Sequence, residues 1–290
     1  MMIFLNNKLV PKNKALISVF DHGFLYGDGI YETIRVYKGI IFKMDEHIKR
    51  LYRSAEMIAL AVPKKPEEIK KAVYKTISAN GHSDAVVRIT ISRGAGPLGL
   101  DPSLCPKPTF VIISNKFRKY PAEYYSKGVK VSIVKTRRNY GPALDPRIKS
   151  LNFLNNVLAK IEAKNSASHE ALMMNYQGYL AEGTISNVFF INKKDILCTP
   201  AIKVGILEGI TRGMILKIAR EMGLKSREGC FRRKDMYNAR EVFITNTSME
   251  VMPVTRVDKV RIAGKAGRLT SIIHEKYKEK VSGFLETYNN

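Results

Sequence analysis

The sequence predicts an α+β protein with two domains that meet near residue 120. Strand-like and helix-like segments alternate up to about residue 114, the periodicity is lost over residues 116–128, and a second mixture of strands and helices follows. A chain of 290 residues is long enough for two separate hydrophobic cores. We therefore expect a small α+β domain at residues 1–120, an interdomain linker at 121–130 and a large α+β domain at 131–290.

In the first domain, strands are expected at 1–10 and 30–43, and the alternating segments AVVRITISRG and PTFVIIS predict two more. Helices are expected over residues 45–60 and from Pro66 to Asn80-Gly81, because apolar residues recur on one face of each. These two faces consist of Ile48, Leu51, Ala55 and Ile58, and of Ile69, Ala72, Val73 and Ile77.

The second domain mixes strands and helices in the same way. Strands are expected at 129–135, 170–176, 187–192 and 241–246, and helices at 211–222 and 267–286. The segment LDPRIKSLNFLNNVLAK predicts a further helix, because apolar residues recur at helical spacing: Leu151, Leu154, Val157, Leu158 and Ile161. We expect this face to be buried, which leaves Lys149 on the turn just before the first core residue.

The composition is that of a soluble globular protein, with 45% apolar and 26% charged residues. The chain has no run of 18 apolar residues and no leader-like start, so we expect no membrane span and a cytoplasmic location. Cys105, Cys198 and Cys230 lie far apart, without the spacing of a disulfide framework or a metal site, and we therefore expect no metal.

The charge is strongly basic, with 49 Lys and Arg against 26 Asp and Glu, or +23. Such a surface attracts nucleic acid, anionic lipid or phosphorylated ligands. The basic residues are scattered, however, and their densest groups are short: Lys64-Lys65, Arg137-Arg138 and Arg232-Arg233-Lys234. We expect a solvated basic surface and no specific nucleic-acid partner. A basic nucleic-acid-binding protein is the non-enzymatic alternative.

Three features are typical of sites for a phosphorylated cofactor, although each alone also fits an ordinary surface position. Thr211 can cap a helix whose free N–H groups would bind an anion. Glu182 follows an apolar segment and precedes Gly183 in a strand–turn–strand context. Lys149 is the third feature.

The combination of motifs resembles the class IV (fold type IV) aminotransferases, which use pyridoxal 5'-phosphate. The resemblance covers nearly the whole chain and rests on six segments in the family's order and spacing. They are FDHGFLYGDGIYETIRVYKG at 20–39, HIKRL at 47–51, RIKSLNFLNNVLAKIEA at 147–163, LAEGTISNVF at 180–189, GILEGITR at 205–212 and EVFITNTSMEVMPV at 241–254. The resemblance implies the two-domain fold of these enzymes, which is also that of D-amino acid aminotransferase.

The resemblance also implies roles for individual residues. Lys149 matches the Schiff-base lysine, whose amine forms the covalent link and then carries the substrate's α-proton. Glu182 matches the carboxylate that pairs with the pyridine nitrogen. The other matching positions hold the phosphate or pack against the ring: Arg50, Ile210, Thr211 and Thr247 for the phosphate, and Leu207 for the ring face.

For the substrate, the segment RGAGPLGLDPSLCPKP at 93–108 resembles the branched-chain enzymes. D-specific members carry an arginine and a histidine in this loop, whereas Leu98 and Leu100 stand at the matching positions here. Arg35 and Arg88 also fit the branched-chain pattern. Tyr31 instead matches the D-specific members, and Thr33 and Ser248 depart from the branched-chain motifs. The expected substrate-binding residues are Tyr31, Arg35, Arg88, Thr247 and Ser248.

These motifs predict transfer of the amino group of L-leucine, L-isoleucine or L-valine to 2-oxoglutarate, as in branched-chain amino acid biosynthesis. D-amino acid transamination and aminodeoxychorismate lyase chemistry are the enzymatic alternatives. The resemblance further implies a homodimer or a larger homo-oligomer.

Overall fold

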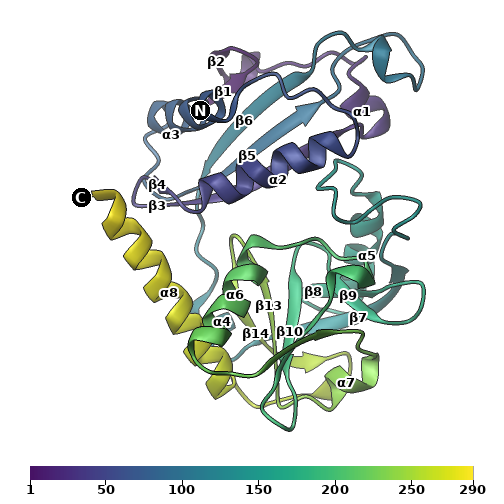
Figure 1. Ribbon diagram of the computed structural model, residues 1–290, viewed down its shortest axis with the longest axis vertical. Coiled ribbons are helices and arrows are strands. Elements are labelled where there is room, and N and C mark those ends of the chain that lie inside the picture. Colours follow the sequence, from purple (N-terminus) through teal and green to yellow (C-terminus); the bar gives the residue numbers. More distant parts are fainter. Residues whose placement is uncertain (290) are drawn as a thin grey trace. The chain divides into compact units, whose positions relative to one another are not determined.

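The computed structural model describes residues 1–289 and divides into two compact units (Figure 1). The first unit contains Met1–Arg118, Ile148–Phe153 and the C-terminal end from Leu285, and the second contains Lys119–Arg147 and Leu154–Phe284. Both units combine helices with sheets, which confirms the α+β prediction. The structure differs from the predicted boundaries in two respects, because the segment Ile148–Phe153 and the C-terminal end from Leu285 both belong to the first unit. Lys149 packs within the first unit, although it was expected to belong to the domain that starts at residue 131.

The first unit is built on an antiparallel sheet with the strand order β2-β1-β6-β5-β3-β4. Its strands are β1 (Met2–Leu5), β2 (Lys8–Pro11), β3 (Gly29–Tyr37), β4 (Ile40–Ile41), β5 (Ala85–Ser92) and β6 (Thr109–Lys116). The helices are η1 (Lys12–Lys14), α1 (His22–Tyr26), α2 (Met44–Glu56), α3 (Pro66–Ala79) and η2 (Pro102–Leu104).

Helices α2 and α3 form one hydrophobic core with this sheet (Figure 1). Ile48 and Leu51 of α2 and Ile69 of α3 are buried against Ile34 of β3 and Ile89 of β5, as the helical periodicity predicts. Successive side chains of a strand point to opposite faces, so residues that alternate with Ile34 and Ile89, such as Thr33 and Arg88, belong to the other face. That second face carries the residues of interest below.

The second unit is built on a mixed sheet with the strand order β12-β11-β10-β13-β14-β7-β8-β9, and β15 pairs with β14. Its strands are β7 (Val129–Arg137), β8 (Glu170–Met174), β9 (Leu180–Gly183), β10 (Asn187–Ile191), β11 (Leu197–Pro200), β12 (Ser226–Gly229), β13 (Glu241–Asn246), β14 (Glu250–Val257) and β15 (Val260–Arg261). The helices are α4 (Ala122–Ser126), α5 (Leu154–Asn165), η3 (Ile202–Val204), α6 (Ile210–Glu221), α7 (Arg233–Tyr237) and α8 (Arg268–Asn289). The expected linker at 121–130 therefore contains α4 and the start of β7.

The orientation of α5 corrects the sequence-based prediction. The helix forms, but the apolar residues expected in its core face are exposed: Leu154 by 71%, Val157 and Leu158 by 48%, and Ile161 by 51%. Ala159 and Ala163 are buried instead, in a small core with Val134, Ala171 and Met173. Small side chains allow α5 to approach β7 and β8 closely, so the larger apolar residues point away from the sheet.

Candidate active site

The backbone of Lys149 is anchored to β3 through its carbonyl and to α2 through its N–H. Its carbonyl accepts a hydrogen bond from the N–H of Tyr31 (2.9 Å), and the pairing continues because the N–H of Leu151 donates to the carbonyl of Gly29 (2.9 Å). The N–H of Lys149 donates to the hydroxyl of Ser54 on α2 (3.2 Å). The lysine is therefore held in a segment that runs alongside β3, before α5 begins.

Tyr31 contacts two basic side chains. The Nζ of Lys149 is 3.2 Å from the Tyr31 hydroxyl and 4.3 Å from the centre of its ring. On the same sheet face, the guanidinium carbon of Arg88 is 3.9 Å from that ring centre. Burial lowers the pKa of Arg88, and contact with Tyr31 partly offsets this effect. Tyr31 thus contacts both basic side chains, Lys149 and Arg88, at one end of the sheet.

Behind this face, a buried carboxylate holds Arg50. The guanidinium donates from Nε to Oε1 of Glu32 (2.7 Å) and from Nη2 to Oε2 (2.8 Å), and Glu32 is fully buried. Oε2 is also 2.7 Å from Nδ1 of His47, which stands one helical turn before Arg50 on α2. Burial alone would raise the pKa of Glu32, but Arg50 and His47 hold that pKa well below its ordinary value.

His47 differs from Arg50 in its charge. Burial lowers the pKa of His47 below its usual value of 6.5, more than Glu32 raises it. His47 is therefore neutral near pH 7, and Arg50 supplies the positive charge that keeps Glu32 ionised. The bidentate pair fixes the plane of the Arg50 guanidinium.

The structure does not place Arg35 where it was expected. Its guanidinium donates to the carboxylate of Asp84 (3.0 Å) and to the carbonyl of Ala85 (3.1 Å). Its Cζ also lies 3.7 Å from the ring centre of Phe117 and 4.3 Å from that of Tyr37. Arg35 is thus a buried residue at the other end of β3, packed against other partners and not beside Tyr31. Arg88 is the arginine that lies beside Tyr31.

In the second unit, Glu182 lies near the end of β9 and is 5% exposed. Both oxygens of its carboxylate accept hydrogen bonds. Oε1 accepts from Nε of Arg138 (2.7 Å), while Oε2 accepts from the backbone N–H of Leu207 (3.0 Å) and from Nδ2 of Asn187 (3.2 Å). This carboxylate is therefore buried, oriented and paired with a cation, and the solvent-facing alternative for Glu182 is wrong.

The start of α6 belongs to the same hydrogen-bond network. Asn187 also donates to the carbonyl of Leu207 (3.0 Å). Oδ1 of Asn187 packs so closely on Gly209 that a Cβ added at Gly209 would lie 2.0 Å from it. Gly209 is the N-cap of α6 and has no side chain to make a capping hydrogen bond. The first N–H groups of the helix, at Ile210 and Thr211, are thus not capped by a side chain at Gly209, and the helix dipole favours an anion there.

The loop between β13 and β14 uses two of its own amide donors internally. Oδ1 of Asn246 already accepts the N–H groups of Ser248 and Met249, both at 2.8 Å. The N–H of Ser248 is therefore already used, which leaves its hydroxyl as a donor for a ligand. Thr247 stands between these residues and is partly exposed, as a ligand-binding hydroxyl would be.

Comparison with known proteins identifies the family. The family model for class IV amino-transferases matches residues 29–257. A putative branched-chain-amino-acid aminotransferase from Methanocaldococcus jannaschii is 41% identical over 280 residues, which cover 96% of each chain. The chain belongs to the class IV aminotransferases.

Other class IV aminotransferase relatives differ in their reactions. An aminodeoxychorismate lyase from Bacillus subtilis is 34% identical, and the match covers 98% of this chain and 96% of that protein. A D-alanine aminotransferase from Bacillus licheniformis is also 34% identical, with 93% of each chain covered. Among solved structures, the branched-chain amino acid aminotransferase from Thermobaculum terrenum in its PLP form has a TM-score of 0.86 at 29% identity, covering 97% of this chain and 94% of that one. The enzyme is thus a branched-chain aminotransferase-like member of a family with several substrate classes.

The donor set of this class IV enzyme fits pyridoxal 5'-phosphate, the cofactor of the family. The second unit combines a buried carboxylate, suited to a pyridine nitrogen, with the N–H groups of a helix start, suited to a phosphate. Asn187 and the Leu207 backbone connect this carboxylate to the start of the helix. The first unit offers a lysine amine and an oriented guanidinium.

Four residues that support these groups were not singled out from the sequence: Glu32, His47, Asn187 and Arg138. Glu32 and His47 lie within the quoted motifs, and Asn187 lies in LAEGTISNVF, but motif membership alone does not say what a side chain contacts. Arg138 was grouped with Arg137 as part of a basic surface. Arg138 directly follows the last residue of β7, and alternation along a strand puts adjacent arginines on opposite faces.

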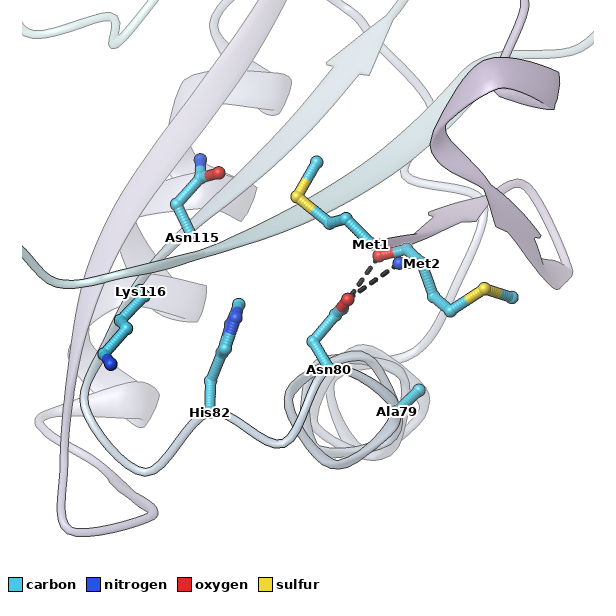
Figure 2. Close-up of a pocket in the computed structure, with 7 residues that line it drawn as sticks. All are labelled: Met1, Met2, Ala79, Asn80, His82, Asn115 and Lys116. Atoms are coloured by element: carbon cyan, nitrogen blue, oxygen red, sulfur yellow. Dashed lines mark hydrogen bonds between the residues drawn. The ribbon is translucent and has the colours of Figure 1, made fainter.

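A pocket of about 360 Å³ in the first unit lies elsewhere (Figure 2). It is lined by Met1, Met2, Ala79, Asn80, His82, Asn115 and Lys116, and Asn80 is hydrogen-bonded to the backbone of Met2 on both sides (2.7 and 2.8 Å). Through the strand register, Lys116 is level with Val36, five residues from Tyr31 and so about 17 Å along β3. This pocket is not part of the candidate active site.

Across residues 1–289, the chain forms no helix that is both long and apolar enough to cross a membrane.

Proposed function

We propose that this enzyme transfers the amino group of L-leucine, L-isoleucine or L-valine to 2-oxoglutarate with pyridoxal 5'-phosphate as cofactor. The observation that carries the proposal is the linked pair formed by Glu182 and the start of α6, which provides a ring-nitrogen partner and a phosphate site within one network. Neither a general nucleic-acid-binding surface nor a structural ion pair requires that combination.

In this proposal, Lys149 binds the cofactor covalently and Glu182 pairs with the pyridine nitrogen. Arg50 and Thr247, with the N–H groups of Ile210 and Thr211, hold the phosphate, and Leu207 packs against the ring face. When bound, the cofactor withdraws electrons from the substrate's α-carbon, which makes the α-proton removable. The bidentate contact of Arg50 with Glu32 supports the phosphate role, since it fixes the guanidinium in one orientation.

The chain's own residues supply the proton transfers. Lys149 in its neutral form takes the α-proton of the substrate and in its charged form returns a proton, acting first as base and then as acid. The Tyr31 hydroxyl, 3.2 Å from Nζ, accepts a hydrogen bond from the amine and limits where it can point. The backbone of Lys149 stays fixed to β3 while the side chain moves, because its carbonyl is bonded to Tyr31.

Arg88 is the proposed partner of the substrate carboxylate. It is half-buried beside Tyr31, and burial makes its charge more effective toward a carboxylate than a fully solvated arginine would be. Tyr31, Thr247 and the Ser248 hydroxyl complete the proposed substrate contacts. Since Leu98 and Leu100 replace the charged pair of D-specific members, we place L-branched-chain substrates before D-alanine.

D-amino acid transamination is the second candidate, because Tyr31 matches the D-specific members and D-alanine aminotransferases are among the relatives. Aminodeoxychorismate lyase chemistry is favoured by one relative's name alone.

The three free thiols, Cys105, Cys198 and Cys230, support a reducing and hence cytoplasmic location as part of the proposal.

We infer a homodimer or larger assembly of this chain from α5. Leu154, Val157, Leu158 and Ile161 form an exposed apolar stripe at i, i+3, i+4 and i+7 spacing. A stripe of this kind is typical of a helix that packs against a partner. A second copy of the chain is the occupant that the family resemblance implies.

A half-reaction screen tests the substrate proposal. The pyridoxal form of the enzyme is mixed separately with L-leucine, L-valine, D-alanine, D-glutamate and aminodeoxychorismate, and conversion to the pyridoxamine form is followed by absorbance. L-Leucine should react faster than D-alanine, and the pyridoxamine form should then be reconverted by 2-oxoglutarate. A faster reaction with either D-amino acid would favour the second candidate, while pyruvate formation from aminodeoxychorismate would favour the lyase.

A further inference from the structure

Arg138 is a largely buried arginine whose guanidinium meets the carboxylate of Glu182. The Nε–Oε1 distance is 2.7 Å, and both side chains are nearly buried, at 9% and 6% exposure. The backbone of Arg138 is also fixed, because its N–H donates to the carbonyl of Met174 at the end of β8 (2.9 Å). The pair therefore bridges the ends of β7 and β9 across β8.

Arg138 and the adjacent Arg137 differ in their surroundings. Arg137 is the last residue of β7 and is exposed, whereas Arg138 is turned to the carboxylate. Both carry the same charge and differ by one position in the chain. A basic surface would not need one of them to be buried, since burying a charge is costly unless a partner compensates it.

The electrostatic effect of Arg138 on Glu182 has a definite direction. When a carboxylate faces a pyridine nitrogen, the two groups share one proton. That proton stays on the nitrogen only while the carboxylate is the weaker base. A cation in contact with the carboxylate stabilises its ionised form and makes it a weaker base. The Asn187 amide and the Leu207 N–H act in the same direction, but neither carries a charge.

We propose that Arg138 is a positioning residue that holds Glu182 ionised, so that the proton shared with the pyridine nitrogen of bound pyridoxal phosphate stays on the nitrogen. This inference rests on the proposed role of Glu182 and adds to it the residue that sets the position of the proton. Removal of the Arg138 charge moves the proton to Glu182 and leaves the ring neutral.

The direct test is ¹⁵N NMR of the enzyme loaded with pyridoxal phosphate labelled at the ring nitrogen. The wild type, R138K and R137M should show the chemical shift of a protonated ring nitrogen, because all three keep a cation at position 138. R138M and R138Q should show the shift of an unprotonated ring nitrogen. A protonated signal in R138M and R138Q would overturn the proposal.

A second measurement separates this role from a structural one. Apoenzyme variants are titrated with pyridoxal phosphate and with its 1-deaza analogue, which lacks the ring nitrogen. R138M should weaken binding of pyridoxal phosphate by roughly 10- to 100-fold, as expected for loss of a charged hydrogen-bond network, and should change binding of the analogue much less. Equal losses for both ligands would assign Arg138 a merely structural role and overturn the proposal.

The controls keep failure of this inference distinct from failure of the proposed function. If the wild type binds neither ligand, the cofactor assignment itself is wrong. If R138M, R138Q and R138K all lose the circular dichroism and cooperative melting of the wild type while R137M keeps them, Arg138 serves only the fold, and the proposal is overturned.

Discussion

The amine of Lys149 and the hydroxyl of Tyr31 lie 3.2 Å apart, and the backbones of the same two residues are joined by a hydrogen bond of 2.9 Å. The lysine that resembles the catalytic lysine of the family is thus tied to one strand residue at both its backbone and its side chain. This double contact holds the lysine in place although it lies outside any helix or strand, as the proposed proton transfer requires.

Lys149→Ala should abolish transamination and leave the fold intact. The alanine removes both the covalent attachment point and the proton carrier, whose joint loss costs many orders of magnitude in rate. The half-reaction with L-leucine measures the effect, and Lys164→Ala, at an exposed position on α5, is the matched control. Turnover close to that of the control would contradict the assignment.

Glu182→Gln should still bind the cofactor but slow the half-reaction by roughly 100- to 1,000-fold, the range typical for loss of one electrostatic stabiliser. A neutral amide has the shape of the carboxylate but does not keep a proton on the ring nitrogen. Stopped-flow absorbance gives the rate, and Glu123→Gln on α4 is the exposed control. An unchanged rate would show that the buried carboxylate has only a structural role.

Glu32→Gln should destabilise the protein near pH 7 by about 3–5 kcal/mol, because it leaves the Arg50 charge buried without its partner. The pKa of Glu32 lies below its ordinary value of 4.5, so its stabilising effect is fully present above that value and is lost as the pH falls further. The difference in unfolding free energy between wild type and variant should therefore shrink below about pH 4.5.

Urea unfolding at several pH values measures this dependence on Glu32. Glu56→Gln, at the exposed end of the same helix α2, should show no comparable loss. A difference between wild type and Glu32→Gln that grows as the pH is lowered would mean that Arg50 does not hold Glu32 ionised.

Leu158→Asp should weaken self-association of the chain. Each leucine-sized side chain buried at an interface contributes about 1.5–3 kcal/mol, and a charge in the centre of the α5 stripe would have to be desolvated. Sedimentation velocity should show a shift toward monomer, while Lys164→Asp on the same helix keeps the assembly of the wild type. A wild type that sediments as a fully active monomer would disprove the inferred interface.

The double variant L98R/L100H should raise the rate with D-alanine relative to L-leucine. Both leucines are strongly exposed, at 69% and 81%, so charged residues fit there without a burial cost. Introducing the charged pair of D-specific members should change the ratio of rates by roughly 10-fold or more, the effect of one charged hydrogen bond. L98M/L100M serves as the apolar control, and an equal ratio in both variants would assign specificity to Tyr31 and the 246–249 loop instead.

The sequence by itself determined the fold class, the helices α2 and α3, and the candidate cofactor residues. Helix periodicity is a local property, so the faces that contain Ile48 and Ile69 could be assigned without the tertiary structure. Lys149 and Glu182 were found because the spacing of short motifs is retained along the chain. Their roles remain predictions that the experiments above test.

Only the tertiary structure decided which side chains meet. Glu182 and Arg138 are 44 residues apart, and Glu32 and Arg50 are 18 apart on different elements, so their contacts depend on strand register and helix placement. The apolar spacing of α5 correctly predicted a helix but gave the wrong face, since periodicity shows that a face will be covered and not what covers it. Arg35 and Arg88 look alike in the sequence. The fold separates them because side-chain packing against Asp84 or Tyr31 is a long-range property of the sheet.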